Sequence, residues 1–138
     1  MRRTWSEFRV LQRGRRFVSW VGRLQPLCQA YTVCVMYRRE PEVGIVAGFL
    51  PSVVVIDPLV HGRDDAPGEP IPHHYPNPEY PELPFLCLYD PDAGEWHPGM
   101  AIARTIVPWT IDWLACYEGW LATGEWTGGG RHPATELS

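Results

Sequence analysis

Eight prolines between Pro58 and Pro84 constrain the fold of this 138-residue chain more than any other feature. Proline fixes φ and lacks a backbone donor, so neither a helix nor a central strand runs easily through such a stretch. We therefore predict an irregular loop over residues 58–84. A loop of this length inside a compact domain is either functional or disordered, and it separates two parts of the chain with different patterns.

The part before the loop has the pattern of antiparallel strands. Aromatic and β-branched residues favour strands over residues 5–12 and 16–24, joined at the Arg13-Gly14 turn into a hairpin. A short helix over residues 4–12 is the competing interpretation. Residues 28–37 form the clearest strand and are apolar on both faces, which predicts a central position in the sheet.

Two further apolar stretches follow this central strand. Val43–Phe49 and Ser52–Asp57 are either one strand broken at Pro51 or two short strands. Proline fits an edge or a bulge rather than a central ladder position. Within the central strand, Cys28 and Cys34 are expected to be core residues, since cysteine packs as a small hydrophobe.

The part after the loop is helical. Pro108 suits the first turn of a helix, and Gly124 suits its C-cap. Between them, apolar residues recur at helical spacing and predict core packing, with Trp109, Trp113, Cys116 and Trp120 on one stripe. Residues 100–106 are expected to form a preceding turn of helix.

Together these elements predict an α+β domain: an antiparallel meander of about four strands packed on a C-terminal helix. The length is that of one domain, which we place at residues 1–127, followed by a loose tail at 128–138. No apolar run is long enough to span a membrane, and we find no secretory signal, so a cytoplasmic location is expected.

Charge and cysteine spacing exclude several function classes. Residues 1–23 carry seven arginines and one acid, whereas the remainder carries five arginines and fifteen acids. Such an acidic body argues against nucleic-acid binding, because phosphate contacts need a basic surface. The basic start is either a solvated edge strand or a contact for an acidic partner. The four cysteines form no CxxC pair, so disulfides and a zinc site are not expected, and we predict no metal and no cofactor.

Cys87 is the strongest candidate for chemistry, because it follows the long loop and precedes an acidic turn. The alternative is a buried packing residue between Leu86 and Leu88. His73 and His74 lie in the loop, where either one could pair with the thiol, or both could be solvated. Asp90 and its neighbouring acids could bind an incoming amine, or form only a polar turn; they would not lower a thiol pKa.

Four motifs resemble known sequences: one active-site-like motif in three pieces, and three further segments. Pro72-His73-His74-Tyr75, then Phe85 to Tyr89 around Cys87, then Trp96, resemble the active-site segment of ubiquitin-conjugating enzymes. Further segments resemble the prokaryotic conjugating-like proteins of CBASS (cyclic-oligonucleotide-based antiphage signalling) operons, in the standalone form. These further segments are residues 20–26, 31–33 and 106–126.

This resemblance implies a UBC-like fold and a catalytic Cys87. The thiol would form a thioester with the C-terminus of a cGAS-like nucleotidyltransferase and pass the acyl group to an amine, priming the signalling. The family's Asn has no counterpart in register here: Asn77 is displaced, which leaves His73, His74 or backbone amides as oxyanion donors. The family's long N-terminal helix is expected to be missing or very short.

Three functions follow from these observations. The first is acyl transfer through Cys87, and the second is a non-catalytic module of the same fold that binds the nucleotidyltransferase. The third is a Cys-His hydrolase, which needs His73 or His74 within hydrogen-bond reach of the thiol. The chain also contains no lysine, so its own side chains offer no amine for self-acylation.

Overall fold

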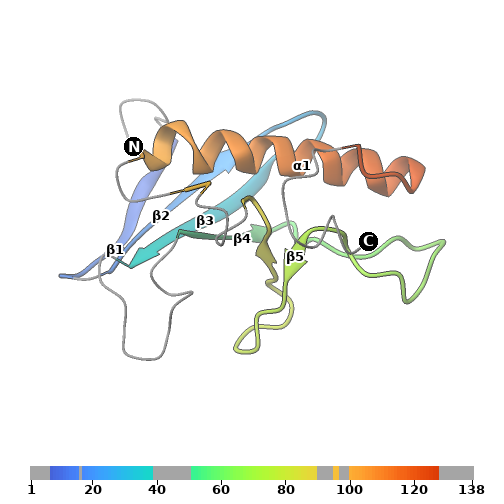
Figure 1. The fold of residues 1–138 in the computed structure, drawn as a ribbon, viewed down its shortest axis with the longest axis horizontal. Coiled ribbons are helices and arrows are strands. Elements are labelled where there is room, and N and C mark those ends of the chain that lie inside the picture. The colour runs from blue at the N-terminus through green and yellow to red at the C-terminus, as the bar shows by residue number, and fades with distance from the viewer. Residues whose placement is uncertain (1–6, 16, 39–50, 90–94, 97–99, 128–138) are drawn as a thin grey trace.

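A four-stranded antiparallel sheet dominates the part of the chain that the computed structural model describes, which is residues 7–15, 17–38, 51–89, 95–96 and 100–127. Each strand pairs with the next one, so the order in space is the order in the chain. Helix α1 (Ile106–Thr123) lies across one face of this sheet (Figure 1). The predicted α+β class and meander are confirmed. The strands are β1 (Arg9–Arg13), β2 (Phe17–Leu24), β3 (Tyr31–Arg38) and β4 (Ser52–Asp57).

The first hairpin is the one predicted. β1 pairs with β2 from Arg9 opposite Val21 to Arg13 opposite Val18, and Gly14 N–H donates to Phe17 O at 2.7 Å to close the turn. The register shifts between Val10 and Gln12, which leaves a bulge on the outer strand. The strand was expected from residue 5, but β1 begins only at Arg9, so the prediction was wrong at Glu7 and Phe8. Residues 5 and 6 lie outside the described residues, and so does Arg16.

β3 is central, as predicted, but it begins three residues later than expected. The carboxylate of Glu118 in α1 accepts the backbone N–H of Cys28 at 3.4 Å and of Gln29 at 3.0 Å. These two amides therefore bind a helix side chain instead of a neighbouring strand. Cys28 is exposed, so its predicted core position was wrong, whereas Cys34 is buried as predicted.

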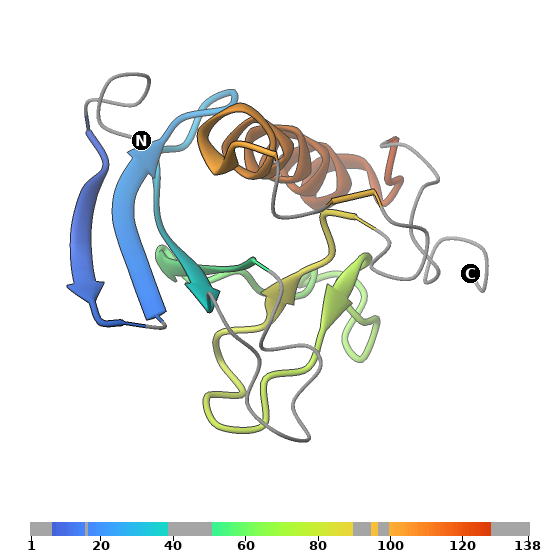
Figure 2. The same ribbon diagram turned by 60° about the vertical axis from the view of Figure 1, so that its left-hand side comes forward.

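β4 has the predicted bounds Ser52–Asp57 and follows Pro51 directly. Its alternating side chains Val53 and Val55 are fully buried. They meet Val33 and Val35 of β3 on the inner face of the curved sheet, which α1 covers (Figure 2). The other predicted stretch, Val43–Phe49, lies outside the described residues.

Helix α1 begins two residues before Pro108, which therefore lies in the first turn, where a missing N–H breaks no intrahelical bond. The helix ends at Gly124 in the left-handed conformation (φ 83°), and Gly124 N–H donates to Trp120 O at 2.8 Å. The short 3₁₀ helix η3 (Ile102–Arg104) precedes it. Trp113 and Trp120 are buried as predicted, but Cys116 is only half-buried at the flank of the stripe, so its predicted core position was wrong.

The long proline-rich loop is irregular over most of its length, with one exception. Strand β5 (His74–Tyr75) lies within it and pairs antiparallel with β6 (Phe85–Leu86). The prediction of no regular structure over 58–84 was therefore wrong at these two residues. This pairing places the two histidines beside the residues that precede Cys87.

Candidate functional site

Cys87 follows β6 directly and is fully buried, at 0% exposure. Its neighbours Leu86 and Leu88 both belong to the main hydrophobic core. The Cys87 backbone N–H donates to His73 O at 3.0 Å, which extends the β5–β6 pairing by one step. The candidate nucleophile is thus held at the end of a short hairpin and against the core.

His73 occupies an unusual backbone conformation beside Cys87. Its φ of 54° lies in the left-handed region, which residues other than glycine rarely adopt, although His is enriched there. Its carbonyl oxygen accepts a second hydrogen bond, from the indole N–H of Trp113 at 2.8 Å. Its ring packs on Trp126 at a centroid distance of 5.1 Å. His73 therefore connects the hairpin to α1 and to the residues just after α1.

His74 lies in β5 opposite Leu86 and is half-buried. Its ring Nδ1 makes a short hydrogen bond with the carbonyl oxygen of Ile71. Because a carbonyl only accepts, Nδ1 carries the proton in this arrangement. The ring is therefore oriented by its own loop, with Nε2 as its other polar atom.

Asn77 is buried, and its side chain organises the segment before β6. Its amide nitrogen donates to Leu83 O at 2.9 Å, and its Oδ1 accepts from Tyr80 N–H at 3.3 Å. Both polar atoms thus bridge the turn that leads into Phe85. Asp90, the other residue predicted to support the site, lies outside the described residues.

Tyr89 is a neighbour of Cys87 that the sequence analysis missed. Its hydroxyl donates to Pro51 O at 2.8 Å, at the start of β4. Burial raises the pKa of Tyr89 above its ordinary value, and Tyr75 and Cys87 add to the rise as nearby ionisable groups. Tyr89 therefore remains a neutral phenol at neutral pH. Its position two residues after Cys87 was the available signal.

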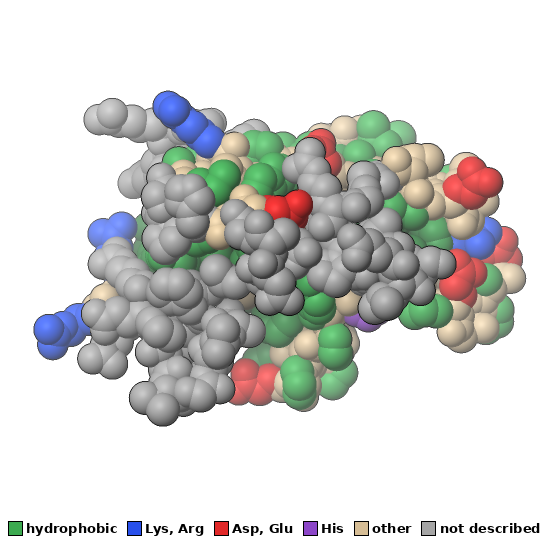
Figure 3. Space-filling view, viewed as in Figure 1, with side chains coloured by type: hydrophobic (Ala, Val, Ile, Leu, Met, Phe, Trp, Pro, Cys, Tyr) green, Lys and Arg blue, Asp and Glu red, His purple; other side chains and the backbone are tan. Residues whose placement is uncertain are grey.

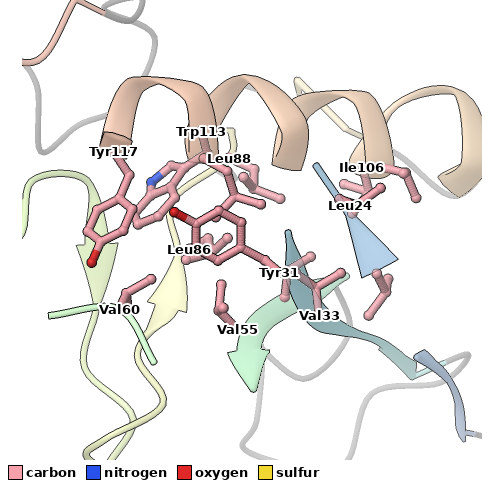
Figure 4. Close-up of a cluster of buried hydrophobic side chains, with 14 of the residues drawn as sticks. Leu24, Tyr31, Val33, Val55, Val60, Leu86, Leu88, Ile106, Trp113 and Tyr117 are labelled. Atoms are coloured by element: carbon pink, nitrogen blue, oxygen red, sulfur yellow. The ribbon is translucent and has the colours of Figure 1, made fainter. Parts of the chain in front are cut away.

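Trp113 is the second residue that was missed as part of the site, since its helical spacing predicted only core packing. The predicted core packing is confirmed. Trp113 stacks on Tyr117 at 5.5 Å, and both side chains point from α1 toward Leu86 and Val60 (Figure 4). No sequence pattern reveals that its N–H reaches a carbonyl 40 residues away.

Trp96 of the family-like segment is a packing residue. Its indole N–H donates to Thr105 Oγ1 at 3.1 Å, and its ring meets Tyr37 of β3 edge-on at 5.6 Å. Trp96 therefore connects β3 to the residue just before α1.

A groove of about 610 Å³ lies elsewhere, between α1 and the loops that flank β3 and β4, and Cys87 does not line it. Glu118 borders the groove and accepts the Tyr31 hydroxyl at 3.2 Å. Burial, followed by this carboxylate, raises the pKa of Tyr31 above its ordinary value. The exposed side chains of Leu27 and Leu59 form its apolar rim.

Basic side chains lie at the β1–β2 end of the face seen in Figure 3, where no acidic side chain is visible. Acidic side chains are spread over the rest of this face, and one basic side chain lies among those at the right-hand end. Arg9, Arg13 and Arg23 are exposed and form no ion pair with another described residue. Among the described residues, no three His, Cys, Asp or Glu side chains gather as metal ligands. Within the same ranges, no helix is long and apolar enough to cross a membrane.

Comparison with known proteins gives one family match. The family model E2-CBASS, described as "Type II CBASS E2 protein", matches residues 1–133, which include every predicted site residue. No curated protein matches the chain.

Proposed function

The chain belongs to the Type II CBASS E2 family, and from this premise we propose that it is an acyl-transfer enzyme that forms a thioester on Cys87. The observation that carries the proposal is the setting of Cys87, whose backbone is bonded to a left-handed His73. Non-glycine residues held in this conformation cluster at active sites. The other cysteines lie in the sheet (Cys34), at the groove (Cys28) or on the flank of α1 (Cys116).

The proposed reaction has two steps. The Cys87 thiolate attacks the carbonyl carbon of an activated C-terminal acyl group, an S–C bond forms, and the activating group leaves. An amine then attacks the thioester carbonyl, an N–C bond forms, the amine loses a proton, and the Cys87 thiolate leaves. The acyl donor must arrive already activated, as an adenylate or a thioester, because a free carboxylate does not react with a thiol.

The proposed acyl donor is the C-terminus of a cGAS-like nucleotidyltransferase, as the family resemblance implies. Both tetrahedral intermediates need donors aimed at the developing oxyanion. The Cys87 N–H is already bonded to His73 O, and both polar atoms of Asn77 bond to their own loop. Of the predicted side-chain donors this leaves the imidazoles of His73, whose backbone lies opposite Cys87, and of His74. Nε2 of His74 would donate only when both ring nitrogens carry protons, because Nδ1 already donates to Ile71 O.

The burial of Cys87 favours a second candidate function. A thiol with 0% exposure does not meet a protein C-terminus unless its surroundings open. A module that binds the nucleotidyltransferase without covalent chemistry needs no such opening. In that case Cys87 would be a packing residue between Leu86 and Leu88.

Co-expression with a cGAS-like nucleotidyltransferase, together with an enzyme that activates its C-terminal carboxylate, separates the two functions. We expect a thiol-labile adduct by intact mass and non-reducing gels, absent in Cys87→Ala and present in Cys116→Ala. Cys87→Ser should trap a more stable oxyester. Because the chain has no lysine, a stable amide on this protein is confined to its α-amine. Binding without any adduct in all four proteins would establish the non-catalytic module instead.

A further inference from the structure

A single carbonyl oxygen joins the three segments around Cys87. His73 O accepts the Cys87 N–H at 3.0 Å and the Trp113 indole N–H at 2.8 Å. A carbonyl oxygen has two lone pairs, so both are used. The start of β5, the residue after β6 and the middle of α1 therefore meet at one atom.

Aromatic contacts hold the Trp113 side chain in this position. Its ring stacks on Tyr117 at 5.5 Å and 15°, and it meets Trp126 edge-on at 5.2 Å. Trp126 in turn packs on the His73 ring at 5.1 Å. Trp113 is 4% exposed, so little of its side chain meets water.

The hairpin that Trp113 contacts has little pairing of its own. β5 and β6 are two residues long, whereas β3 is eight residues long and pairs on both sides. Short elements with few backbone bonds open locally at a lower free-energy cost than a central strand. The left-handed φ of His73 adds strain that local opening would release.

We propose that Trp113 is a positioning residue for Cys87: through His73 O, its indole N–H holds the hairpin closed and sets how often the buried thiol becomes accessible. This inference rests on the proposed function, because only a reactive Cys87 needs to be reached. It assigns to Trp113 a role beyond core packing, and it makes opening of the hairpin the step that precedes acyl transfer.

Thiol-labelling kinetics test the proposal, with Cys34 as the internal reference. The full chain is treated with iodoacetamide under native conditions, and the labelling of each cysteine is followed by peptide mass spectrometry. Trp113→Phe keeps an aromatic ring but removes the N–H. We expect about a tenfold faster labelling of Cys87, the effect of losing about one net hydrogen bond, with Cys34 unchanged.

Trp120→Phe is the matched control. Trp120 is also a buried tryptophan of α1, but its N–H donates at 3.2 Å to Glu69 Oε1, away from the hairpin. The Trp120→Phe variant should therefore label with the same ratio of Cys87 to Cys34 as the unaltered chain. An equal rise at both cysteines in Trp113→Phe, or no change at Cys87, would overturn the proposal.

A measurement on the unaltered chain covers the case in which Trp113→Phe does not fold. Amide hydrogen exchange of Cys87 reports directly on its bond to His73 O. We expect the Cys87 amide to exchange at least tenfold faster than the Cys34 amide after correction for intrinsic rates. Equal protection would mean that the hairpin opens only with the whole domain. If Trp113→Phe speeds the labelling of Cys87 but the co-expression experiment gives no adduct, the proposed enzyme activity is excluded. The role of Trp113 in holding the hairpin closed would still stand.

Discussion

Cys34 and Cys87 are both buried, but the two regions that bury them differ. Cys34 lies in β3, which is paired with β2 and β4 along most of its length. Cys87 follows a two-residue strand and is held by one carbonyl and by side chains of α1. Cys34 is 7% exposed in a strand that is paired on both sides, whereas Cys87 is 0% exposed beside a two-residue strand. We therefore expect access to Cys34 to depend on the sheet, and access to Cys87 to depend on the hairpin alone.

The strongest test of this comparison weakens the core that both regions share. Leu114 of α1 is fully buried, and Leu114→Ala should lower the free energy of unfolding by about 3 kcal/mol through lost burial and a cavity. Because β3 is paired on both sides, we expect Cys34 labelling to follow global unfolding and to rise about a hundredfold. Cys87 labelling should rise much less. Equal increases at both cysteines would remove the distinction between the two regions.

A change confined to the sheet sharpens the comparison. A Cβ on Gly22 of β2 would lie 2.4 Å from the ring of the buried Phe8, so Gly22→Ala forces that ring to move. We expect a loss of about 2 kcal/mol in urea unfolding, typical of overpacking. Labelling should increase at Cys34 rather than at Cys87.

Gly119→Ala is the control for this substitution. Gly119 lies within α1, and nothing is within 4 Å of an added Cβ. Alanine should stabilise the helix by about 0.5–1 kcal/mol. A stabilising Gly22→Ala would show that Phe8 has room to move, and that the sheet is less tightly packed than its burial indicates.

The smallest expected effect concerns the hydroxyl beside Cys87. The raised pKa of Tyr89 means that the native state keeps its proton more firmly than the unfolded chain does. This contribution to stability is complete below about pH 10 and is lost as the pH rises further. Tyr89→Phe should cost about 1 kcal/mol at pH 7, because Pro51 O loses its donor, and should lose less stability above pH 10. Urea unfolding at pH 7, 9.5 and 10.5 measures the cost at neutral pH and the loss of stability at alkaline pH. A Tyr89→Phe variant that loses as much stability above pH 10 as the unaltered chain would contradict the raised pKa of Tyr89.

Local patterns were sufficient for most of the secondary structure. The apolar stretch after Pro51 marked β4 with its correct bounds, and Pro108 and Gly124 marked the two ends of α1 closely. These features act within a few residues, through φ restriction, the apolar run and the left-handed C-cap. The predictions failed where a distant group replaced the local partner, as Glu118 does for the amides of Cys28 and Gln29.

The candidate site was predicted only as a set of residue types. Cys87, His73 and His74 were identified from their positions around the loop, and the β5–β6 pairing does bring their backbones together. Trp113 and Tyr89 were not predicted as part of the site, because their hydrogen bonds join residues 40 and 38 positions apart. Such contacts leave no periodic signal, because they depend on how finished elements pack.

The sequence by itself determined the α+β order, the central strand, the helix and the family resemblance, because each depends on local preferences or on motifs read in order. Only the tertiary structure decided that Cys87 is buried, that His73 is left-handed, and that one carbonyl links the hairpin to α1. The physical reason is that burial and hydrogen-bond partnership belong to pairs of distant segments. They are set when the sheet, the hairpin and the helix close on a common core.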